Sequence, residues 1–212
     1  MVDLLAGLFR DEAMVAKIRK KLPYLFKLAE LEVSRGGKVG MEAGTLRERV
    51  VVAMLKYYFG EHKVKEPDII THEVDVILEG HSNPISIKTK TGRGYSGVKL
   101  VWTVDWKKVD EFVEIYKPKA DILFSRINWD GIGEFCYIPL KLQLELFGKY
   151  GGLYFKKPKK ETNPRGVEIS SDVLQEAVAT AKNMGYVIDI YWKTANIGYD
   201  PYKRWIDLWA EE

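Results

Sequence analysis

The stretch "PISIKTK", residues 84–90, decides how the middle of this chain folds. Apolar and polar residues alternate along it, which is typical of a strand with one face in a hydrophobic core. The other face presents Ser86, Lys88 and Lys90. Two ammonium groups at neighbouring positions of one face repel each other unless negative charge lies close to them. The stretch therefore predicts a strand that has an acidic partner.

The acidic partner that we expect is Asp75. It lies at the centre of "HEVDVILEG" (72–80), which also alternates like a strand, and ten residues separate it from Ser86. A turn through "GHSNP" would return the chain as an antiparallel neighbour, so that Asp75 faces Ser86 and the two lysines. A carboxylate within a core strand is uncommon unless it is paired or bound to a metal.

Helices and strands are interspersed along the rest of the chain. Helices are expected over residues 11–34, with a break before Pro23, and over 45–60, 105–117, 139–149 and 171–184; further strands are expected over 98–104, 120–127, 133–140 and 186–192. Such interspersion predicts an α/β fold, a sheet with helices on its faces.

Length and composition set the broad class. The 212 residues are 46% apolar and 30% charged, which fits a single soluble domain over 1–212 with an N-terminal helical subregion over about 1–36. The net charge of +3 says little about partners. Cys136 is the sole cysteine, so no internal disulfide can form, and we expect it to be buried. With no signal peptide and no long apolar run, we expect a cytoplasmic protein without membrane contact.

The spacing of Asp75, Ser86 and Lys88 resembles the PD-(D/E)xK nucleases, which carry an Asp on one strand and an (Asp/Glu)-x-Lys on the next. Two positions depart from that pattern. Val74 stands where the family has proline, and Ser86 stands where it usually has an acid. In restriction enzymes with serine at this position, the resemblance implies that another carboxylate supplies the missing metal ligand.

A longer resemblance narrows the family. Six stretches, from about residue 37 to the C-terminus, resemble the ThaI family of type II restriction endonucleases: "GKVGMEAGTLRERVVVAML", "EVDVILEG", "PISIKTKTG", "GVKLVWTVD", "NPRGVEIS" and "YDPYKRWIDLW". The resemblance implies a restriction-endonuclease-like mixed central sheet flanked by helices. It also implies a Mg²⁺-dependent homodimer that cuts double-stranded DNA at a short CG-rich palindrome, CGCG. A cognate DNA methyltransferase is then expected in the host, although not as a physical partner.

The chemistry of phosphodiester hydrolysis suits these residues. Mg²⁺ prefers hard oxygen ligands, activates water and offsets charge on the phosphate. We expect Asp75, Glu48 and the backbone carbonyl of Ile87 to bind the metal, and Lys88 to orient or deprotonate the attacking water. The expected catalytic residues are Asp75, Lys88, Ser86 and Glu48.

The carboxylate that completes the metal site stays open between three residues. On a helical wheel Glu48 shares a face with buried-type residues, but "TLRE" (45–48) is also a capping-box pattern, in which Glu48 would only cap its own helix. Glu42, in the loop before that helix, is the second candidate. Glu73, on the expected face of Asp75, is the third.

Basic residues and a Gly-rich loop are candidates for DNA contacts. The loop "TGRGYSG" (91–97) follows the active strand, and glycine lets a backbone approach a ligand closely. Arginine paired with guanine is the commonest specific base contact, but a phosphate or plain surface role stays open for each basic residue. The candidates are Met41, Lys90, Arg93, Tyr95, Lys99, Arg165, Lys193, Lys203 and Arg204.

Met41 stands among glycines in "GKVGMEAG" (37–44), just before the helix with Glu48. It could simply pack on the first helical region. However, CG steps unstack easily, and apolar side chains serve as wedges between base pairs. The resemblance suggests insertion of this kind, so we expect Met41 to enter the DNA stack from the minor groove.

Two other functions are compatible with parts of this pattern. One is a nuclease-fold DNA-binding module without catalysis, which would not need both Asp75 and Lys88. The other is a Ser/Lys hydrolase that uses Ser86. Such enzymes place the serine on a sharp turn or at a helix end, beside an oxyanion hole, whereas Ser86 lies within a predicted strand.

Overall fold

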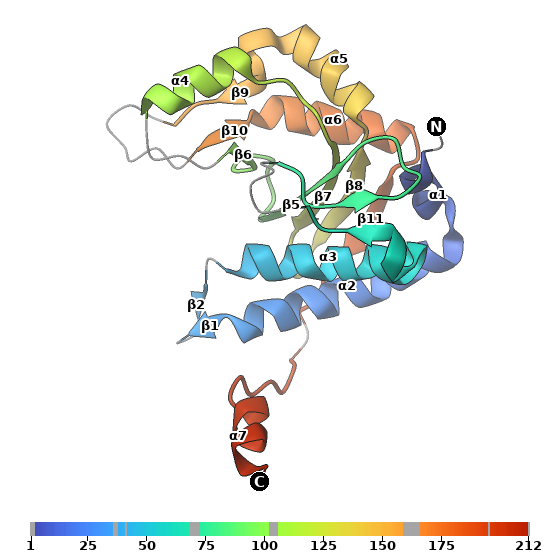
Figure 1. The fold of residues 1–212 in the computed structure, drawn as a ribbon, viewed down its shortest axis with the longest axis vertical. Helices are drawn as coiled ribbons and strands as arrows, with labels where there is room; N and C mark the ends of the chain where they lie inside the picture. The colour runs from blue at the N-terminus through green and yellow to red at the C-terminus, as the bar shows by residue number, and fades with distance from the viewer. Residues whose placement is uncertain are drawn as a thin grey trace.

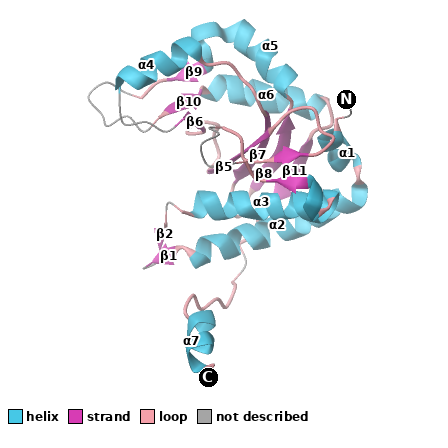
Figure 2. Ribbon diagram, in the orientation of Figure 1, coloured by secondary structure: helices cyan, strands magenta, loops and turns pink. Residues whose placement is uncertain are grey.

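The protein has a four-stranded mixed sheet at its centre (Figures 1 and 2). The computed structural model describes residues 3–35, 38–40, 42–67, 73–101, 106–158, 166–194 and 196–211. In the central sheet, β5 (Ile85–Thr91) pairs in parallel with β7 (Asp121–Ile127), and β8 (Ile132–Ile138) and β11 (Val187–Tyr191) follow antiparallel. β5 is thus an edge strand. The mixed sheet confirms the expected fold class.

Helices cover both faces of this sheet, as Figure 1 shows. One face carries α1 (Leu4–Arg10), α2 (Glu12–Glu32) and α3 (Ala43–Phe59). The opposite face carries α4 (Trp106–Ile115), α5 (Leu140–Tyr150), α6 (Ser171–Asn183) and a small sheet of β6 (Lys99–Val101), β10 (Val167–Ile169) and β9 (Phe155–Lys156).

Short elements connect these layers. They are β1 (Ser34–Arg35) paired with β2 (Lys38–Val39), β3 (Val64–Lys65) paired with β4 (Ile77–Leu78), and the 3₁₀ turns Glu61–Lys63 and Gly151–Tyr154. A last helix, α7 (Lys203–Ala210), stands away from the body of the protein at the C-terminal end (Figure 1). No helix in the described part of the chain is both long enough and apolar enough to cross a membrane.

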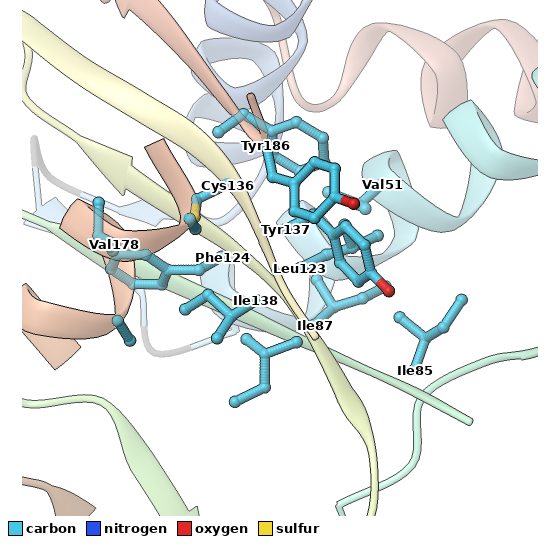
Figure 3. Packing of buried hydrophobic residues seen from close by; sticks show 14 of the residues in the cluster. Val51, Ile85, Ile87, Leu123, Phe124, Cys136, Tyr137, Ile138, Val178 and Tyr186 are labelled. Atoms are coloured by element: carbon cyan, nitrogen blue, oxygen red, sulfur yellow. The ribbon is translucent and has the colours of Figure 1, made fainter. Parts of the chain in front are cut away.

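Both faces of the central sheet contribute to one hydrophobic core (Figure 3). On the α1–α3 face, the rings of Phe9 and Phe135 stack with centroids 5.5 Å apart. On the α6 face, Val178 lies near Phe124 and Cys136. Cys136 is fully buried, as expected, and burial raises its thiol pKa well above the ordinary range. The N-terminal helices therefore share a core with the sheet.

The predicted break before Pro23 is wrong, because α2 continues unbroken from Glu12 to Glu32. Proline removes one helical hydrogen bond and costs about 3 kcal/mol in a helix interior. Leu22, Pro23 and Phe26 are buried in the core, and burial of large apolar side chains contributes about 1.5–3 kcal/mol each. Packing therefore outweighs the local penalty.

The expected strand over 72–80 is also largely wrong. Only Ile77–Leu78 forms a strand, β4, and it pairs with β3 rather than with β5. The strand-type pairing of this segment with β5 is limited to one bridge between Val76 and Ile85, in the antiparallel direction that was expected. Residues 68–72 lie outside the described part, as does the end of the expected strand 98–104, which is described only as β6.

A buried ion pair fixes α3 against α2. The Arg47 guanidinium donates to the Glu30 carboxylate, and the indole N–H of Trp129 donates to the same carboxylate at 3.0 Å. Both charged residues are nearly inaccessible to solvent. Since Arg47 precedes Glu48 on the helix, this pair sets the direction in which Glu48 points.

A Glu30→Ala variant should lower the free energy of unfolding by about 3–5 kcal/mol, because it leaves a buried guanidinium without a counter-ion. Urea unfolding followed by circular dichroism measures this change. Lys203→Ala is the matched control, since it removes an exposed pair with Asp207 on α7 and should cost under about 1 kcal/mol. Equal losses in the two variants would contradict the structural role of Glu30.

Candidate active site

Asp75 is bound to the free edge of β5. Its carboxylate Oδ2 accepts the backbone N–H of Ile87 at 2.5 Å and the hydroxyl of Ser86 at 3.2 Å. Its own backbone N–H donates to the Ile85 carbonyl at 2.9 Å. The side chain thus takes the place that a neighbouring strand's carbonyl would occupy. Oδ1 takes part in neither of the two side-chain bonds.

The carbonyl of Ile87 lies at the same edge. In a strand, the N–H and C=O of one residue point to the same side. Because the Ile87 N–H points to Asp75 and away from β7, its carbonyl also points to this edge. A backbone oxygen and the Asp75 carboxylate therefore lie side by side.

Glu48 comes to this edge from α3. Burial raises the pKa of its carboxyl to about 7, with a further increase from the negative charge of Asp75 and an opposing effect of Lys88. The capping-box alternative is wrong, because α3 begins at Ala43 and Thr45 already lies inside the helix. Glu48 is therefore free of a capping role and lies within electrostatic reach of both Asp75 and Lys88.

Glu73 is the second carboxylate near Lys88. It has a φ of 67°, in the left-handed region that costs energy for a residue other than glycine. It lines a small cavity with Lys88, Lys119 and Tyr116, and its Oε1 is buried without a hydrogen-bond partner. Burial raises its pKa to about 7, while Lys119 and Lys88 lower it and Asp75 raises it.

Glu42 does not reach this group of carboxylates. It is the exposed N-cap residue of α3, and its carboxylate lies beside Gly40. Glu48 lies six residues further along the helix, roughly 9 Å away at 1.5 Å per residue. Of the three candidates left open by the sequence, the structure brings Glu48 and Glu73 to Asp75.

The two lysines of β5 have different acidic neighbours. The positive charge of Lys88 lowers the pKa of both Glu48 and Glu73, whereas the negative charge of Asp75 raises both values. Lys90 lies at the other end of the strand, where burial lowers its pKa, Arg126 lowers it further, and Glu168 opposes this change. Lys88 therefore belongs to the carboxylate site, and Lys90 belongs to a separate charged cluster.

The donor set fits Mg²⁺. Asp75, Glu48 and the Ile87 carbonyl supply hard oxygens, and one or two carboxylates with water and substrate phosphates are the usual ligands of this ion. Within the described ranges, no group of three or more His, Cys, Asp or Glu side chains is arranged to hold a metal. A site completed by water and DNA phosphate agrees with both observations.

Apart from Lys90, the DNA-contact candidates fall into three groups. Tyr95 and Lys99 are engaged within the protein: Arg126 lies over the Tyr95 ring, 5.1 Å from its centroid, and Lys99 pairs with Glu168. Exposed candidates are Arg93, Lys193, Lys203 and Arg204. Met41 and Arg165 lie outside the described residues.

The sequence interpretation missed Lys119 and Tyr116. They follow α4 and enter the site because β5 and β7 run in parallel, with the Asp121 N–H donating to the Pro84 carbonyl at 2.8 Å. Parallel strands need a long crossover, so residues some thirty positions from Ser86 return beside it. The expected pairing of strand 72–80 with β5 did not include this crossover.

Comparison with known proteins agrees with this geometry. The family model "Restriction endonuclease ThaI" matches residues 8–211. A solved structure described as "Restriction endonuclease in complex with substrate DNA" is similar to this chain, with a TM-score of 0.90 and 48% sequence identity over 99% of this chain and 100% of that one. No curated protein matches. The chain therefore belongs to the ThaI family of restriction endonucleases.

Proposed function

We propose that this protein is a Mg²⁺-dependent type II restriction endonuclease that hydrolyses both strands of DNA at a short CG-rich palindrome, CGCG. The observation that carries the proposal is the cluster of Asp75, Glu48 and Lys88 at the free edge of β5. It combines oxygen ligands for a metal with a cation for the phosphate. Family membership supports the reaction class.

In this proposal Asp75, Glu48 and the Ile87 carbonyl hold Mg²⁺. When bound, the ion lowers the pKa of its water and offsets negative charge on the phosphate. Ser86 acts as a positioning residue, because its hydroxyl donates to the Asp75 carboxylate and holds it against β5. The Ile87 N–H serves the same purpose.

Lys88 is the side chain that we expect to act directly on the phosphate and on the attacking water. Its ammonium lies beside Asp75 and stabilises the charge that builds up on phosphate oxygens as the bond to the attacking water forms. It also orients that water by donating a hydrogen bond to it. Glu73 shares a small cavity with Lys88 and Lys119, whose positive charges lower its pKa against the larger effect of burial.

We propose that DNA is held by a homodimer, because a palindrome is best matched by two-fold related subunits, each of which cuts one strand. The exposed Arg93, Lys193, Lys203 and Arg204 are available for phosphate or base contacts. Met41 as a wedge at a CG step stays part of this proposal. We also propose that the enzyme acts in the cytoplasm, together with a methyltransferase that protects the host DNA.

The Ser/Lys hydrolase alternative is unfavourable. Ser86 is only 3% exposed, lies within β5 and donates its hydroxyl to a carboxylate. A nucleophile needs access to substrate and a base beside its proton. Ser86 lacks that access, and the carboxylate beside its proton is the one assigned to the metal, so a positioning role suits it better.

The proposed function is tested by incubating unmethylated plasmid with the protein and Mg²⁺ and mapping the DNA ends. Discrete fragments with ends at CGCG are expected, and EDTA should prevent them. Cutting at another fixed sequence would overturn the proposed target alone. Absence of metal-dependent cutting would overturn the nuclease assignment of the Asp75 site.

Two glutamine substitutions, one at Glu48 and one at Glu73, distinguish which of the two residues binds the metal. Glu48→Gln should reduce the single-turnover cleavage rate about 100-fold or more, because a neutral amide binds Mg²⁺ poorly. Glu73→Gln should reduce it less than 10-fold, since Glu73 faces Lys119 rather than the Ile87 carbonyl edge. The reverse order of effects would identify Glu73 as the ligand.

A further inference from the structure

Helix α7 exposes a large apolar face. Trp205, Ile206, Leu208 and Trp209 are 56%, 60%, 47% and 91% exposed, and none of the helix's residues is buried. An eight-residue helix is marginal in water on its own and depends on packing of its apolar face. Exposed apolar patches of this kind mark interaction surfaces. The helix therefore needs a partner surface that the described part of this chain does not supply.

The segment before α7 is a long arm. The last anchored residue is Thr194, whose N–H and hydroxyl donate to the Asp130 carboxylate at 3.0 and 2.8 Å. Residues 196–202 have no regular secondary structure, and α7 stands beyond α2, away from the body (Figure 1). From Thr194 to Lys203 the chain can extend by roughly 30 Å. That reach is enough to place α7 on a neighbouring molecule.

An apolar groove, which matches the apolar face of α7, lies between α2 and α3. It has a volume of about 450 Å³ and is lined mainly by apolar side chains, including Ile18, Leu22, Val50 and Met54. Helix-in-groove binding uses such a surface to take the apolar face of an amphipathic helix. The groove therefore fits a helix that presents the Trp205 and Trp209 side chains.

The charges at the two surfaces are also complementary. Exposed Lys17 and Lys21 line the groove, one helical turn apart. Asp207 of α7 pairs with Lys203 on the same helix at 3.1 Å, and Glu211 directly follows the helix. The pair is exposed and contributes under about 1 kcal/mol, so contact with Lys17 or Lys21 can replace it. The carboxyl end of a helix is itself negative, which adds to the attraction.

We propose that α7 of each copy packs into the α2–α3 groove of a second copy, which forms a homodimer by reciprocal exchange of C-terminal arms. The inference deepens the proposed function, which requires two subunits on one palindrome. It identifies the assembly surface and connects it to the site, because α3 carries Glu48 as well as Val50 and Met54.

Cysteine cross-linking without DNA or Mg²⁺ tests the exchange directly. Ala53 lines the groove and Ala210 lies on α7, and both are small and exposed. The native Cys136 is fully buried, so it does not compete. Under mild oxidation, a mixture of size-tagged Ala53→Cys protein with Ala210→Cys protein should give at least tenfold more cross-linked heterodimer than a control mixture of Ala179→Cys, exposed on α6, with Ala210→Cys.

The double variant Ala53→Cys/Ala210→Cys distinguishes exchange from folding back. A cross-linked monomer from the double variant, with no heterodimer from the mixture, would mean that α7 occupies its own groove and would overturn the proposal. Absence of any cross-link above the control would also overturn it. Cross-linking at high yield in a protein that does not cut DNA would leave the exchange standing and overturn only the proposed nuclease function.

The oligomeric state of full-length variants gives an independent readout. Trp209→Asp places a charge on the apolar face of α7 and should convert the dimer to a monomer in sedimentation velocity. Its far-ultraviolet circular dichroism should match that of the wild type, because Trp209 is 91% exposed within its own chain. Leu153→Asp, at a 75% exposed apolar residue elsewhere, should remain dimeric. A Trp209→Asp dimer that loses only DNA affinity would assign α7 to DNA and overturn the exchange.

Discussion

A Lys88→Ala variant is expected to cut DNA about 10²–10⁴-fold more slowly than the wild-type protein under single-turnover conditions. Lys88 is the cation that acts on both Glu48 and Glu73, beside Asp75. Without Lys88, the nearby carboxylates repel the negative charge that develops on the phosphate, and no ammonium group beside them donates a hydrogen bond to it. The affinity for DNA should change less than tenfold, because one phosphate contact is a small share of the total. Filter binding in Ca²⁺ measures affinity separately from the rate.

Lys90→Ala is the matched control for this variant. Lys90 lies on the same strand and face, two residues along, but its charged neighbours are Arg126 and Glu168. We expect its loss to weaken DNA binding and to leave the rate at saturating enzyme within tenfold. If the two alanine variants lose cleavage rate equally, the proposed catalytic role of Lys88 is wrong. The lysines on this face of β5 would then serve only to attract DNA.

The sequence predicted this site where local periodicity determines the structure. Alternation along β5 places Ser86, Lys88 and Lys90 on one face, and these residues oppose Ile122, Phe124 and Arg126 of β7 in register. The helical wheel of α3 also predicted the inward direction of Glu48, because Val52 and Leu55 on the same face are buried. In both cases the regular repeat of the strand or helix determines the face on which each side chain lies, so the position in the sequence is enough to predict it.

The structure departs from the sequence interpretation where segments far apart in the chain could each pair with the same strand. Alternation in 72–80 indicates a strand but does not identify its partner, and β4 pairs with β3 instead of β5. The left-handed backbone at Glu73 likewise has no signal in sequence, because glycine or asparagine is the usual residue there. Asp75 still reaches Ser86, since a side chain bonded to the Ile87 N–H replaces the missing strand.

The C-terminal helix shows a different limit of the sequence. The stretch "YDPYKRWIDLW" provides Lys203 and Arg204 as DNA-contact candidates, but in the structure its apolar residues are exposed as well. A pattern predicts amphipathicity and not the surface that receives it. Only the placement of α7 beyond α2, together with the groove between α2 and α3, indicates a second copy of the chain.

An Asp75→Asn variant is expected to lose cleavage by about 10³-fold or more while its fold remains intact. The amide oxygen can still accept the Ile87 N–H and the Ser86 hydroxyl, so the edge of β5 keeps its bonds. The negative charge that a metal needs is removed, and loss of a metal-based contribution of several kcal/mol corresponds to this change in rate. Rapid-quench measurement with excess enzyme gives the rate.

Stability should change in the opposite direction to activity. The charge of Asp75 raises the pKa of both Glu48 and Glu73, so the three carboxylates repel one another in the metal-free protein. Asp75→Asn relieves that repulsion, and its thermal midpoint in EDTA should equal or exceed that of the wild type. Mg²⁺ should raise the midpoint of the wild-type protein and leave that of the variant unchanged, because only a ligand that binds the folded state stabilises it.

Asp121→Asn separates a site carboxylate from a structural one. Asp121 is fully buried and accepts hydrogen bonds from the Leu140 N–H at 2.6 Å and from His81 Nε2 at 2.7 Å, and neither partner belongs to the Asp75 site. Its neutralisation should lower the thermal midpoint and leave the response to Mg²⁺ in place. If Asp75→Asn also lowered the midpoint, with Mg²⁺ still stabilising the variant, Asp75 would be a second structural carboxylate. The metal would then have to bind through Glu48 or Glu73, the two carboxyl groups whose pKa values Lys88 lowers.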